Sequence, residues 1–193
     1  MQAVCVFCGS HSGTDFAFRA VAAAVGQTLA ELDLTLIYGG GRVGLMGVLA
    51  DAALAHGGRV VGVIPAPLAA KEVAHSGLTQ LHLVSSMHER KALMMELSDG
   101  FIALPGGFGT LEEFFEVLTW GQLGIHRKPC GLLNVAGYYD QLIAFIDTAV
   151  REGFIAPEHR GLVLQDTSIL GLLDQLRAYR PPSTTKWVSL QET

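Results

Sequence analysis

Residues 105–113 have the side chains and spacing most suited to chemistry in this sequence: Pro-Gly-Gly-Phe-Gly-Thr-Leu-Glu-Glu. An apolar run at 100–104 precedes them and predicts a buried strand, whereas residues 111–123 predict a helix. Glycines let the backbone approach a ligand closely, and a helix start offers unpaired N–H groups at the positive end of its dipole. The stretch therefore predicts a phosphate seat with two carboxylates in the first helical turn. Its candidate ligand-binding residues are Gly106, Gly107, Phe108, Gly109, Thr110, Glu112 and Glu113.

The two glutamates also have a purely structural interpretation. Thr110 and Glu113 have the spacing of a capping box, in which Glu113 would only accept a hydrogen bond from the backbone N–H of Thr110. Acidic residues are also common in the first turn of a helix, where they stabilise its dipole. The pattern by itself leaves both catalysis and helix capping open for Glu113.

A basic pair, Arg90 and Lys91, stands in an unusual place. Ser86 and Glu89 have the capping-box spacing and predict a helix over 87–98, so the basic pair falls in or just past its first turn. Cations are disfavoured at that end of a helix. Either both side chains reach solvent, or they are held there to meet an anion. The position ahead of the strand at 100–104 favours the anion.

Two further glycine-rich turns follow predicted strands. Residues 9–13 read Gly-Ser-His-Ser-Gly, and residues 39–47 read Gly-Gly-Gly-Arg-Val-Gly-Leu-Met-Gly. A tight turn with close helix–sheet packing needs these glycines, and so does the close approach of a ligand. The additional candidates for substrate binding are Gly9, Ser10, Gly40, Gly41 and Met46.

Several common kinds of site are not indicated. The first turn lacks the G-x-G-x-x-G fingerprint and Tyr38, not an acid, ends the second predicted strand, which argues against NAD. A P-loop motif is absent, and the seven histidines have no ligand spacing, so we expect no metal and no cofactor. Cys5 and Cys8 have a C-x-x-C spacing but lie within an apolar strand, which favours core packing over redox chemistry.

Strands and helices must alternate to position these turns. Strands are predicted over 3–8, 34–38, 59–64, 80–84, 100–104, 130–134 and 162–165. Helices are predicted over 15–32, 45–56, 87–98, 111–123, 138–152 and 168–179. This alternation predicts an α/β fold with one doubly wound, mostly parallel sheet and helices on both faces. Ligands of such folds bind at the carboxyl ends of the strands, so all three glycine turns should share one edge.

The chain organisation and its composition limit the partners. We expect one domain over 1–180, a long loop over 66–79 and a loosely ordered tail over 181–193. With 13 basic and 18 acidic residues the net charge is −5, which argues against nucleic acid or an anionic membrane. No apolar run is long enough to span a membrane, and we expect a cytoplasmic protein. The apolar residues of 111–123 cover a wide arc, which points to burial by a second subunit.

At this point the sequence resembles a known family. Residues 105–113 match P-G-G-x-G-T-x-x-E, residues 87–91 match M-H-x-R-K, and residues 38–47 match Y-G-G-G-x-x-G-L-M-G. These motifs are typical of the Lonely Guy family, the cytokinin riboside 5′-monophosphate phosphoribohydrolases, long labelled "possible lysine decarboxylase". The similarity runs from Cys5 to about Tyr179. It implies a Rossmann-like homodimer that hydrolyses the N-glycosidic bond of a nucleoside 5′-monophosphate, releasing an adenine-type base and ribose 5-phosphate.

By position, the resemblance assigns the catalytic residues to Arg90 and Glu113. It assigns substrate contacts to Glu72, Lys91, the loop 107–110, Glu112 and Thr119. Glu72 lies in a loop without a motif of its own. A carboxylate beside the sugar would stabilise positive charge in the transition state and activate water, as in glycoside hydrolysis.

Two alternatives remain beside hydrolysis. One is a non-catalytic nucleotide-binding or carrier module of similar fold, which would not need the carboxylate at Glu113. The other is decarboxylation, which normally needs pyridoxal phosphate on a lysine. The lysines are Lys71, Lys91, Lys128 and Lys186, and the one near a motif, Lys91, is already explained by an anion site.

Overall fold

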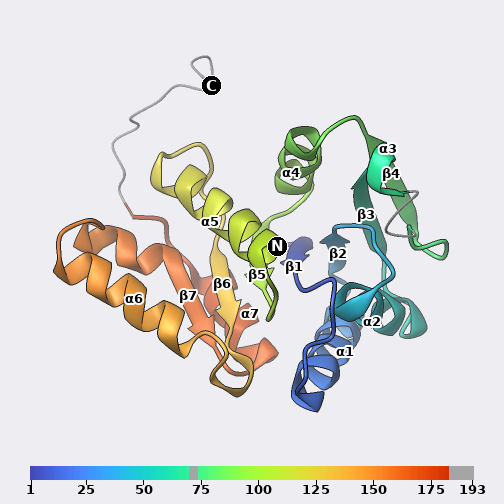
Figure 1. The fold of residues 1–193 in the computed structure, drawn as a ribbon, viewed down its shortest axis with the longest axis horizontal. Coiled ribbons are helices and arrows are strands. Elements are labelled where there is room, and N and C mark those ends of the chain that lie inside the picture. Colours follow the sequence, from blue (N-terminus) through green and yellow to red (C-terminus); the bar gives the residue numbers. More distant parts are fainter. Residues whose placement is uncertain (70–73, 183–193) are drawn as a thin grey trace.

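The computed structural model describes residues 1–69 and 74–182, and within them a single parallel sheet forms the centre of the molecule (Figure 1). The strand order in this part of the chain is β4-β3-β2-β1-β5-β6-β7, and every pair of neighbours is parallel. The bounds are β1 Ala3–Phe7, β2 Thr35–Tyr38, β3 Val60–Pro65, β4 Gln80–Val84, β5 Gly100–Ala103, β6 Cys130–Leu133 and β7 Val163–Asp166. The predicted α/β fold is confirmed, and the sheet is parallel throughout.

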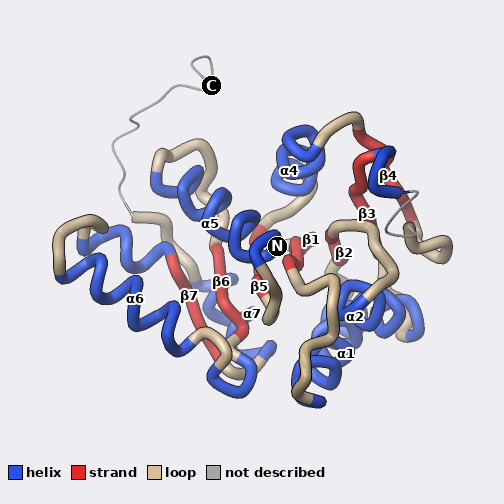
Figure 2. The backbone as a smooth tube through the Cα atoms, viewed as in Figure 1, coloured by secondary structure: helices blue, strands red, loops and turns tan. Residues whose placement is uncertain are grey.

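Helices cover both faces of the sheet (Figure 2). One layer holds α1 (Phe16–Glu31), α2 (Gly44–Ala55) and α7 (Ile169–Ala178). The opposite layer holds α4 (Met87–Glu96), α5 (Phe108–Gln122) and α6 (Asp140–Arg151). Short helices α3 (Ala66–Ala69), η1 (Val135–Gly137) and η2 (Pro157–Leu162) lie in the connections.

The central strand β1 explains why both faces must be covered. Val4 and Val6 pack into the core of the α1, α2 and α7 layer, whereas Cys5 and Phe7 pack into the core of the α4, α5 and α6 layer. Successive side chains of a strand point to opposite faces, so an uninterrupted apolar run buries both. This packing fixes the register of β1, and with it the position of the turn that follows.

The strand order reverses between β1 and β5. From β1 the chain adds β2, β3 and β4 on one side, and from β5 it adds β6 and β7 on the other. The turns after these two strands meet, because the N–H of Gly9 donates to the carbonyl of Pro105 at 3.1 Å. The N–H of Leu45, within the glycine-rich turn at 39–47, donates to the carbonyl of Gly9 at 3.0 Å. The three turns therefore share one edge of the sheet, as the alternation predicted.

Some element bounds differ from those predicted. The segment expected as a loop over 66–79 begins with the short helix α3, because Pro67 fits the first turn of a helix. Helix α6 begins at Asp140 instead of 138. Ala136 and Gly137 both have positive φ, so the chain makes a tight turn there before the helix can begin. Most of the tail predicted over 181–193 lies outside the described residues.

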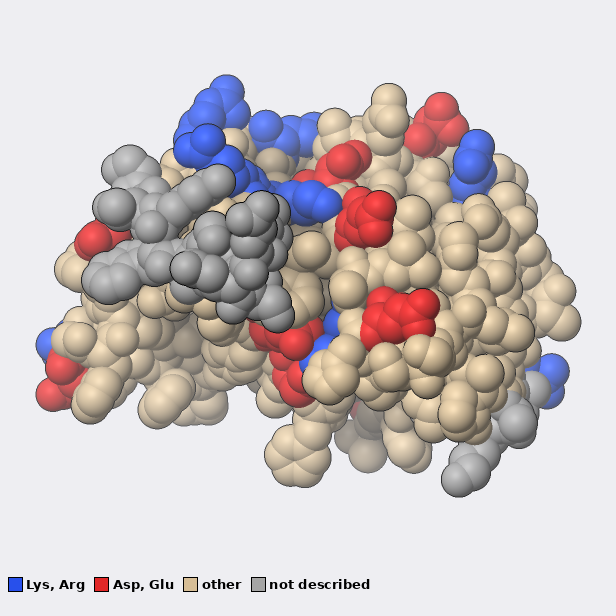
Figure 3. Space-filling model, turned by 90° about the horizontal axis from the view of Figure 1, so that it is seen from above, with Lys and Arg blue, Asp and Glu red and all other residues tan. Residues whose placement is uncertain are grey.

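The outer surface mixes charged and uncharged side chains. On the face drawn in Figure 3, acidic and basic side chains of the described residues both appear among a larger uncharged area. Within residues 1–69 and 74–182, no helix is long and apolar enough to cross a membrane.

Candidate active site

A cavity of about 290 Å³ opens at the point where the strand order reverses. Five segments line it: residues 6–10 from β1 and its turn, Gly39 with Met46, Leu68 of α3, Met87 with Arg90 of α4, and residues 107–110 with Glu112 and Glu113 of α5. Ligands of doubly wound sheets bind at this position, because the connections diverge there and leave a crevice. The cavity therefore joins the three glycine turns to Met87 and Arg90 of α4.

The start of α5 lines the cavity and has the geometry predicted for an anion seat. Its first helical hydrogen bond runs from the N–H of Leu111 to the carbonyl of Gly107, so the N–H groups of residues 108–110 precede the bonded ladder. A Cβ atom on Gly107 or Gly109 would meet no heavy atom within 4 Å of the described protein, so both backbones face open space. Gly106 is packed instead, because a Cβ there would overlap the side chain of Thr110.

The capping interpretation of Glu113 is wrong. Helix α5 begins at Phe108 with Gly107 as its N-cap, three residues earlier than predicted, and no acidic residue lies in its first turn. Glu112 and Glu113 therefore lie in the second turn. Thr110 is inside the helix and is not its N-cap, so Glu113 cannot form a capping box with it. The early start arises because Gly107, with its extended backbone, can take the N-cap position without a side-chain hydrogen bond.

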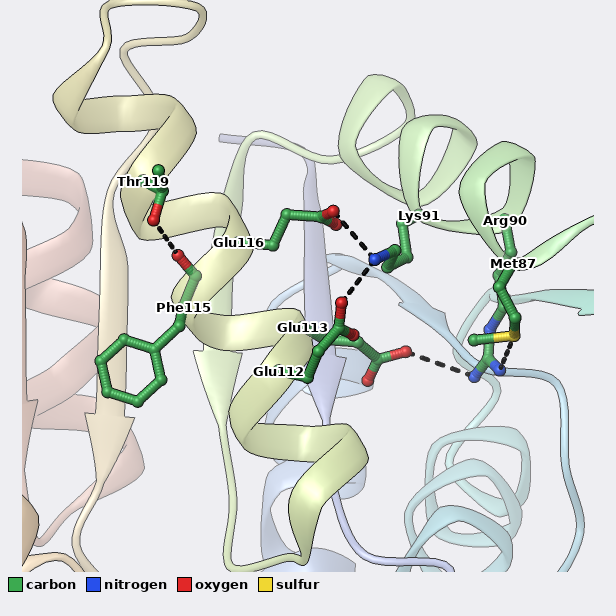
Figure 4. Close-up of polar contacts among 8 residues, drawn as sticks. All are labelled: Met87, Arg90, Lys91, Glu112, Glu113, Phe115, Glu116 and Thr119. Carbon is green, nitrogen blue, oxygen red and sulfur yellow. Dashed lines mark hydrogen bonds and ion pairs between the residues drawn. The ribbon is translucent and has the colours of Figure 1, made fainter.

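Glu113 faces Arg90 across the cavity (Figure 4). Their Oε1 and Nη2 atoms are 3.5 Å apart, and the side chains are only 12% and 9% exposed. Burial raises the pKa of Glu113 from about 4.5 to about 7, against the attraction of Arg90 and Lys91, while Glu112 and Glu116 add repulsion. A carboxylate with a pKa near neutrality can both hold and release a proton at physiological pH.

The guanidinium group of Arg90 has few protein partners. Its Nη1 lies 3.7 Å from the sulfur of Met87, a weak contact. Its Nε is buried and has no hydrogen-bond partner among the described residues. Buried donors are normally paired, so an unpaired one beside a cavity indicates a place for a ligand acceptor.

Lys91 is engaged by two carboxylates instead of lining the cavity (Figure 4). Its Nζ lies 2.5 Å from Oε1 of Glu112 and 2.8 Å from Oε1 of Glu116. Burial lowers the pKa of Lys91, but the hydrogen bonds to Glu112 and Glu116 outweigh it and hold the pKa above its ordinary value. Lys91 therefore stays charged and offsets the carboxylates around Glu113.

The remaining candidate residues are not all brought together. Gly9, Ser10 and Met46 line the cavity. Gly40 and Gly41 turn away from it, toward residues after the loop: the carbonyl of Gly40 accepts from the N–H of His75, and Gly41 pairs with Ala74. The hydroxyl of Thr119 donates to the carbonyl of Phe115 on the far part of α5 (Figure 4). Thr119 lines a separate hollow. Glu72 lies outside the described residues.

Sequence reasoning missed several residues of this region, among them residues 6–8 at the end of β1 and just after it, which line the cavity. Gly39, Leu68 and Met87 line the cavity, and Glu116 binds Lys91. Met87 belongs to the M-H-x-R-K motif and Gly39 to the glycine turn, so both had a signal. Leu68 and Glu116 are an ordinary apolar residue and an ordinary helix surface residue, and their roles depend on the packing of α3 and α4.

A more open hollow of about 510 Å³ lies near the ends of β6 and β7, and it is lined by Asp140, Asp147 and Asp166. Each of these carboxylates already accepts from a protein group: Asn134, Arg160 and the N–H of Ser168, respectively. Among the residues that the structure describes, no group of three potential metal ligands gathers there or elsewhere. The hollow offers no reactive group comparable to Glu113.

The fold and the cavity together define an α/β protein whose switch point carries a cavity lined by the start of α5 and a buried glutamate. Solved structures share this fold. The molybdenum cofactor carrier protein of Chlamydomonas reinhardtii superposes with a TM-score of 0.70 at 22% identity, covering 92% of this chain and 99% of that one. At that identity the likeness concerns the fold alone.

Sequence relatives are much closer. The profile of a family described as "Possible lysine decarboxylase" matches residues 46–176. The cytokinin riboside 5′-monophosphate phosphoribohydrolase of Rhodococcoides fascians is 53% identical over 178 residues, which cover 92% of this chain and 90% of that protein. A cytokinin riboside 5′-monophosphate phosphoribohydrolase of Arabidopsis thaliana is 51% identical over 92% of this chain and 82% of its own length.

The chain belongs to the Lonely Guy family of cytokinin riboside 5′-monophosphate phosphoribohydrolases. The resemblance drawn from the three sequence motifs is thereby confirmed. The non-catalytic carrier alternative is not favoured, because the carriers share only the fold, whereas relatives named as hydrolases share about half of the sequence.

Proposed function

We propose that this protein hydrolyses the N-glycosidic bond of adenosine 5′-monophosphates, including N6-substituted ones, and releases the free base and ribose 5-phosphate. The observation that carries the proposal is the buried pair of Glu113 and Arg90, 3.5 Å apart, beside an anion seat in one cavity. The names of relatives at about 50% identity support the same reaction.

The anion seat fixes the orientation of the substrate. The 5′-phosphate binds the free N–H groups at the start of α5, where the backbone of Gly107 and Gly109 faces open space. The sugar then lies over the second turn of α5, next to Glu113. The base then contacts the apolar lining residues of the same cavity, Met46, Leu68 and Met87.

Glu113 and water carry the chemistry. As the C1′–N bond breaks, its electron pair leaves with the base, and the sugar gains oxocarbenium character. The carboxylate of Glu113 stabilises this positive charge and takes a proton from the water whose oxygen bonds to C1′. The departing base nitrogen receives a proton from solvent, and Glu113 afterwards releases its proton to solvent, so the overall reaction consumes one water. Arg90 keeps Glu113 partly ionised, and its unpaired Nε can donate to the substrate.

The experiment is a turnover assay on AMP with free adenine as the readout. We expect Glu113→Gln to bind AMP as the wild type does and to lose nearly all turnover. The matched control is Glu158→Gln, an exposed glutamate outside the cavity, which should keep wild-type turnover. Adenosine, which lacks the phosphate, should react far more slowly than AMP. Full activity of Glu113→Gln would contradict the proposal.

The apolar residues of the cavity lining also bear on which base the enzyme prefers. Met46, Leu68 and Met87 are apolar residues of the cavity lining, and their contact with the base would favour a base carrying an apolar N6 substituent. A comparison of kcat/KM for AMP and N6-isopentenyl-AMP measures this preference. Equal values would remove the case for cytokinin nucleotides as the preferred substrates.

We also propose that residues 1–180 act as one catalytic domain, that the enzyme is a homodimer and that it works in the cytoplasm. The three cysteines are buried and unpaired within the described residues, which fits a reducing compartment.

Support for the dimer comes from apolar side chains exposed around α5 and α6: Phe115, Phe145 and Phe154 are 39%, 67% and 87% exposed. Light scattering should give twice the mass of one chain, and a monomer mass would contradict the dimer.

A further inference from the structure

We propose that Gly39 is the positioning residue of Arg90: the absence of a side chain at Gly39 provides the space in which the guanidinium group lies beside Glu113. The inference rests on the proposed function, because the position of Arg90 matters to turnover only if Arg90 acts in the reaction.

The contact between the two residues is close. Gly39 is buried directly after β2, at the edge of the cavity. A Cβ atom on Gly39 would overlap Nη2 of Arg90, the same nitrogen that faces Glu113, and would lie 3.2 Å from Cζ. Its next neighbour would be the sulfur of Met46 at 3.5 Å. The space beside Gly39 is therefore filled by side chains of the candidate active site.

Backbone conformation does not explain this glycine. Gly40, the next residue, has a φ of +77°, a conformation that favours glycine by itself. Gly39 is not among the residues with positive φ, so alanine can adopt its backbone without strain. What requires glycine at position 39 is the guanidinium group that lies against it.

The surroundings of Arg90 decide where it would go if Gly39 gained a methyl group. The sulfur of Met87 lies 3.7 Å from Nη1, and Oε1 of Glu113 lies 3.5 Å from Nη2. The remaining free direction is the cavity itself, which Arg90 lines. The end of an arginine side chain moves easily, so the fold adapts at little cost while the guanidinium leaves its place near Glu113. A displacement of about 1 Å within an active site is enough to slow a reaction up to about 100-fold.

The displacement also has an electrostatic consequence. The groups that face Glu113 are Arg90 and Lys91 from α4, Glu112 and Glu116 from its own helix, the thiol of Cys5 from β1 and the thiol of Cys8 directly after β1. Arg90 stabilises the charged form of Glu113. When Arg90 moves away, the ionised carboxylate becomes less stable and the acidic limb of the pH profile shifts to higher pH.

The test compares Gly39→Ala with Gly161→Ala, in which a Cβ meets nothing within 4 Å among the described residues. We expect both variants to melt close to the wild type. Only Gly39→Ala should lose kcat/KM for AMP, by about 10-fold to 100-fold. In that variant alone the acidic limb should move to higher pH, and a crystal structure should place the guanidinium deeper in the cavity.

Several other results would overturn the role of Gly39 in positioning Arg90. Wild-type kcat/KM and pH profile in Gly39→Ala overturn the inference, and so does a crystal structure with Arg90 unmoved. If Gly39→Ala melts at a lower temperature, the double variant Gly39→Ala/Arg90→Lys is measured, because the narrower ammonium head leaves room for the methyl group. If the double variant melts at as low a temperature as Gly39→Ala alone, the inference is overturned. If the wild type releases no base from any nucleotide, the proposed function fails, and the crystal structure of Gly39→Ala still tests the inference.

Discussion

Replacing Glu113 by glutamine should make the folded protein more stable at alkaline pH while it abolishes turnover. The reason is the burial of the carboxylate, which is 12% exposed and has Arg90 as its nearest cation at 3.5 Å. The contact is too long to compensate fully for lost hydration. Glutamine has the same shape as the protonated carboxyl group and no charge, so it removes this cost.

The magnitude follows from the two pKa values. The pKa of Glu113 is about 4.5 when solvated and about 7 in the folded protein. Between these pH values the folded protein binds more protons than the unfolded chain, so the free energy of unfolding falls as pH rises. Above pH 7 the loss is complete, and it amounts to about 3 kcal/mol at about 1.4 kcal/mol per pH unit. The variant should gain this amount at pH 8 and nothing near pH 4.5.

The assay is urea unfolding of the wild type and Glu113→Gln at several pH values from 5 to 9, with equal m-values as the condition for comparison. Glu112→Gln on the same helix is the control, because its side chain is 54% exposed and its change should stay below about 1 kcal/mol. If Glu113→Gln is no more stable than the wild type at pH 8, or if the difference does not shrink toward pH 5, the reasoning about a costly buried carboxylate is refuted.

Three further predictions concern the same region. The kcat/KM for AMP should fall about tenfold per pH unit below about pH 7, because the ionised form of Glu113 is required; a flat profile down to pH 5 would contradict this. Glu116→Gln should move this acidic limb of the pH–rate profile to lower pH, because it removes a negative charge near Glu113. Lys91→Met should move the limb to higher pH, because it removes a positive charge. If neither limb moves in pH–rate measurements, both residues have a purely structural role. Tyr139→Phe should lower the free energy of unfolding by about 1 kcal/mol in urea, because the buried hydroxyl donates to the carbonyl of Leu104 at 2.7 Å; an unchanged free energy would mean that this bond adds nothing.

Much of the fold could be predicted from local patterns. The apolar runs and the glycine turns gave all seven strands of the described residues within one or two positions of their observed bounds. The alternation of strands and helices predicted the parallel sheet, because parallel neighbours need crossover connections. The bounds of helices were less predictable, since Gly107 acts as an N-cap without a side chain and Pro67 starts a helix inside an expected loop.

The candidate active site was predictable only in part. The motifs identified Glu113, Arg90 and the glycine loop, and the structure brings these together around one cavity. The motif that suggested Gly40 and Gly41 contributes Gly39 to the cavity instead, because a positive φ at Gly40 turns the chain away. The roles of Leu68 and Glu116 could not be predicted, since their neighbours lie on other elements of the fold.

The sequence by itself determined the class of fold, the family and the residues of the reactive motif, because these depend on residue types at fixed spacing along the chain. Only the tertiary structure decided where Glu113 lies and what surrounds it. Helix α5 begins three residues earlier than predicted, so Glu113 is a buried partner of Arg90 and not a helix cap. It also decided that Lys91 is held by Glu112 and Glu116, away from the cavity lining. Burial and distance between α4 and α5 set the charge of these groups, and no local pattern in the sequence contains that distance.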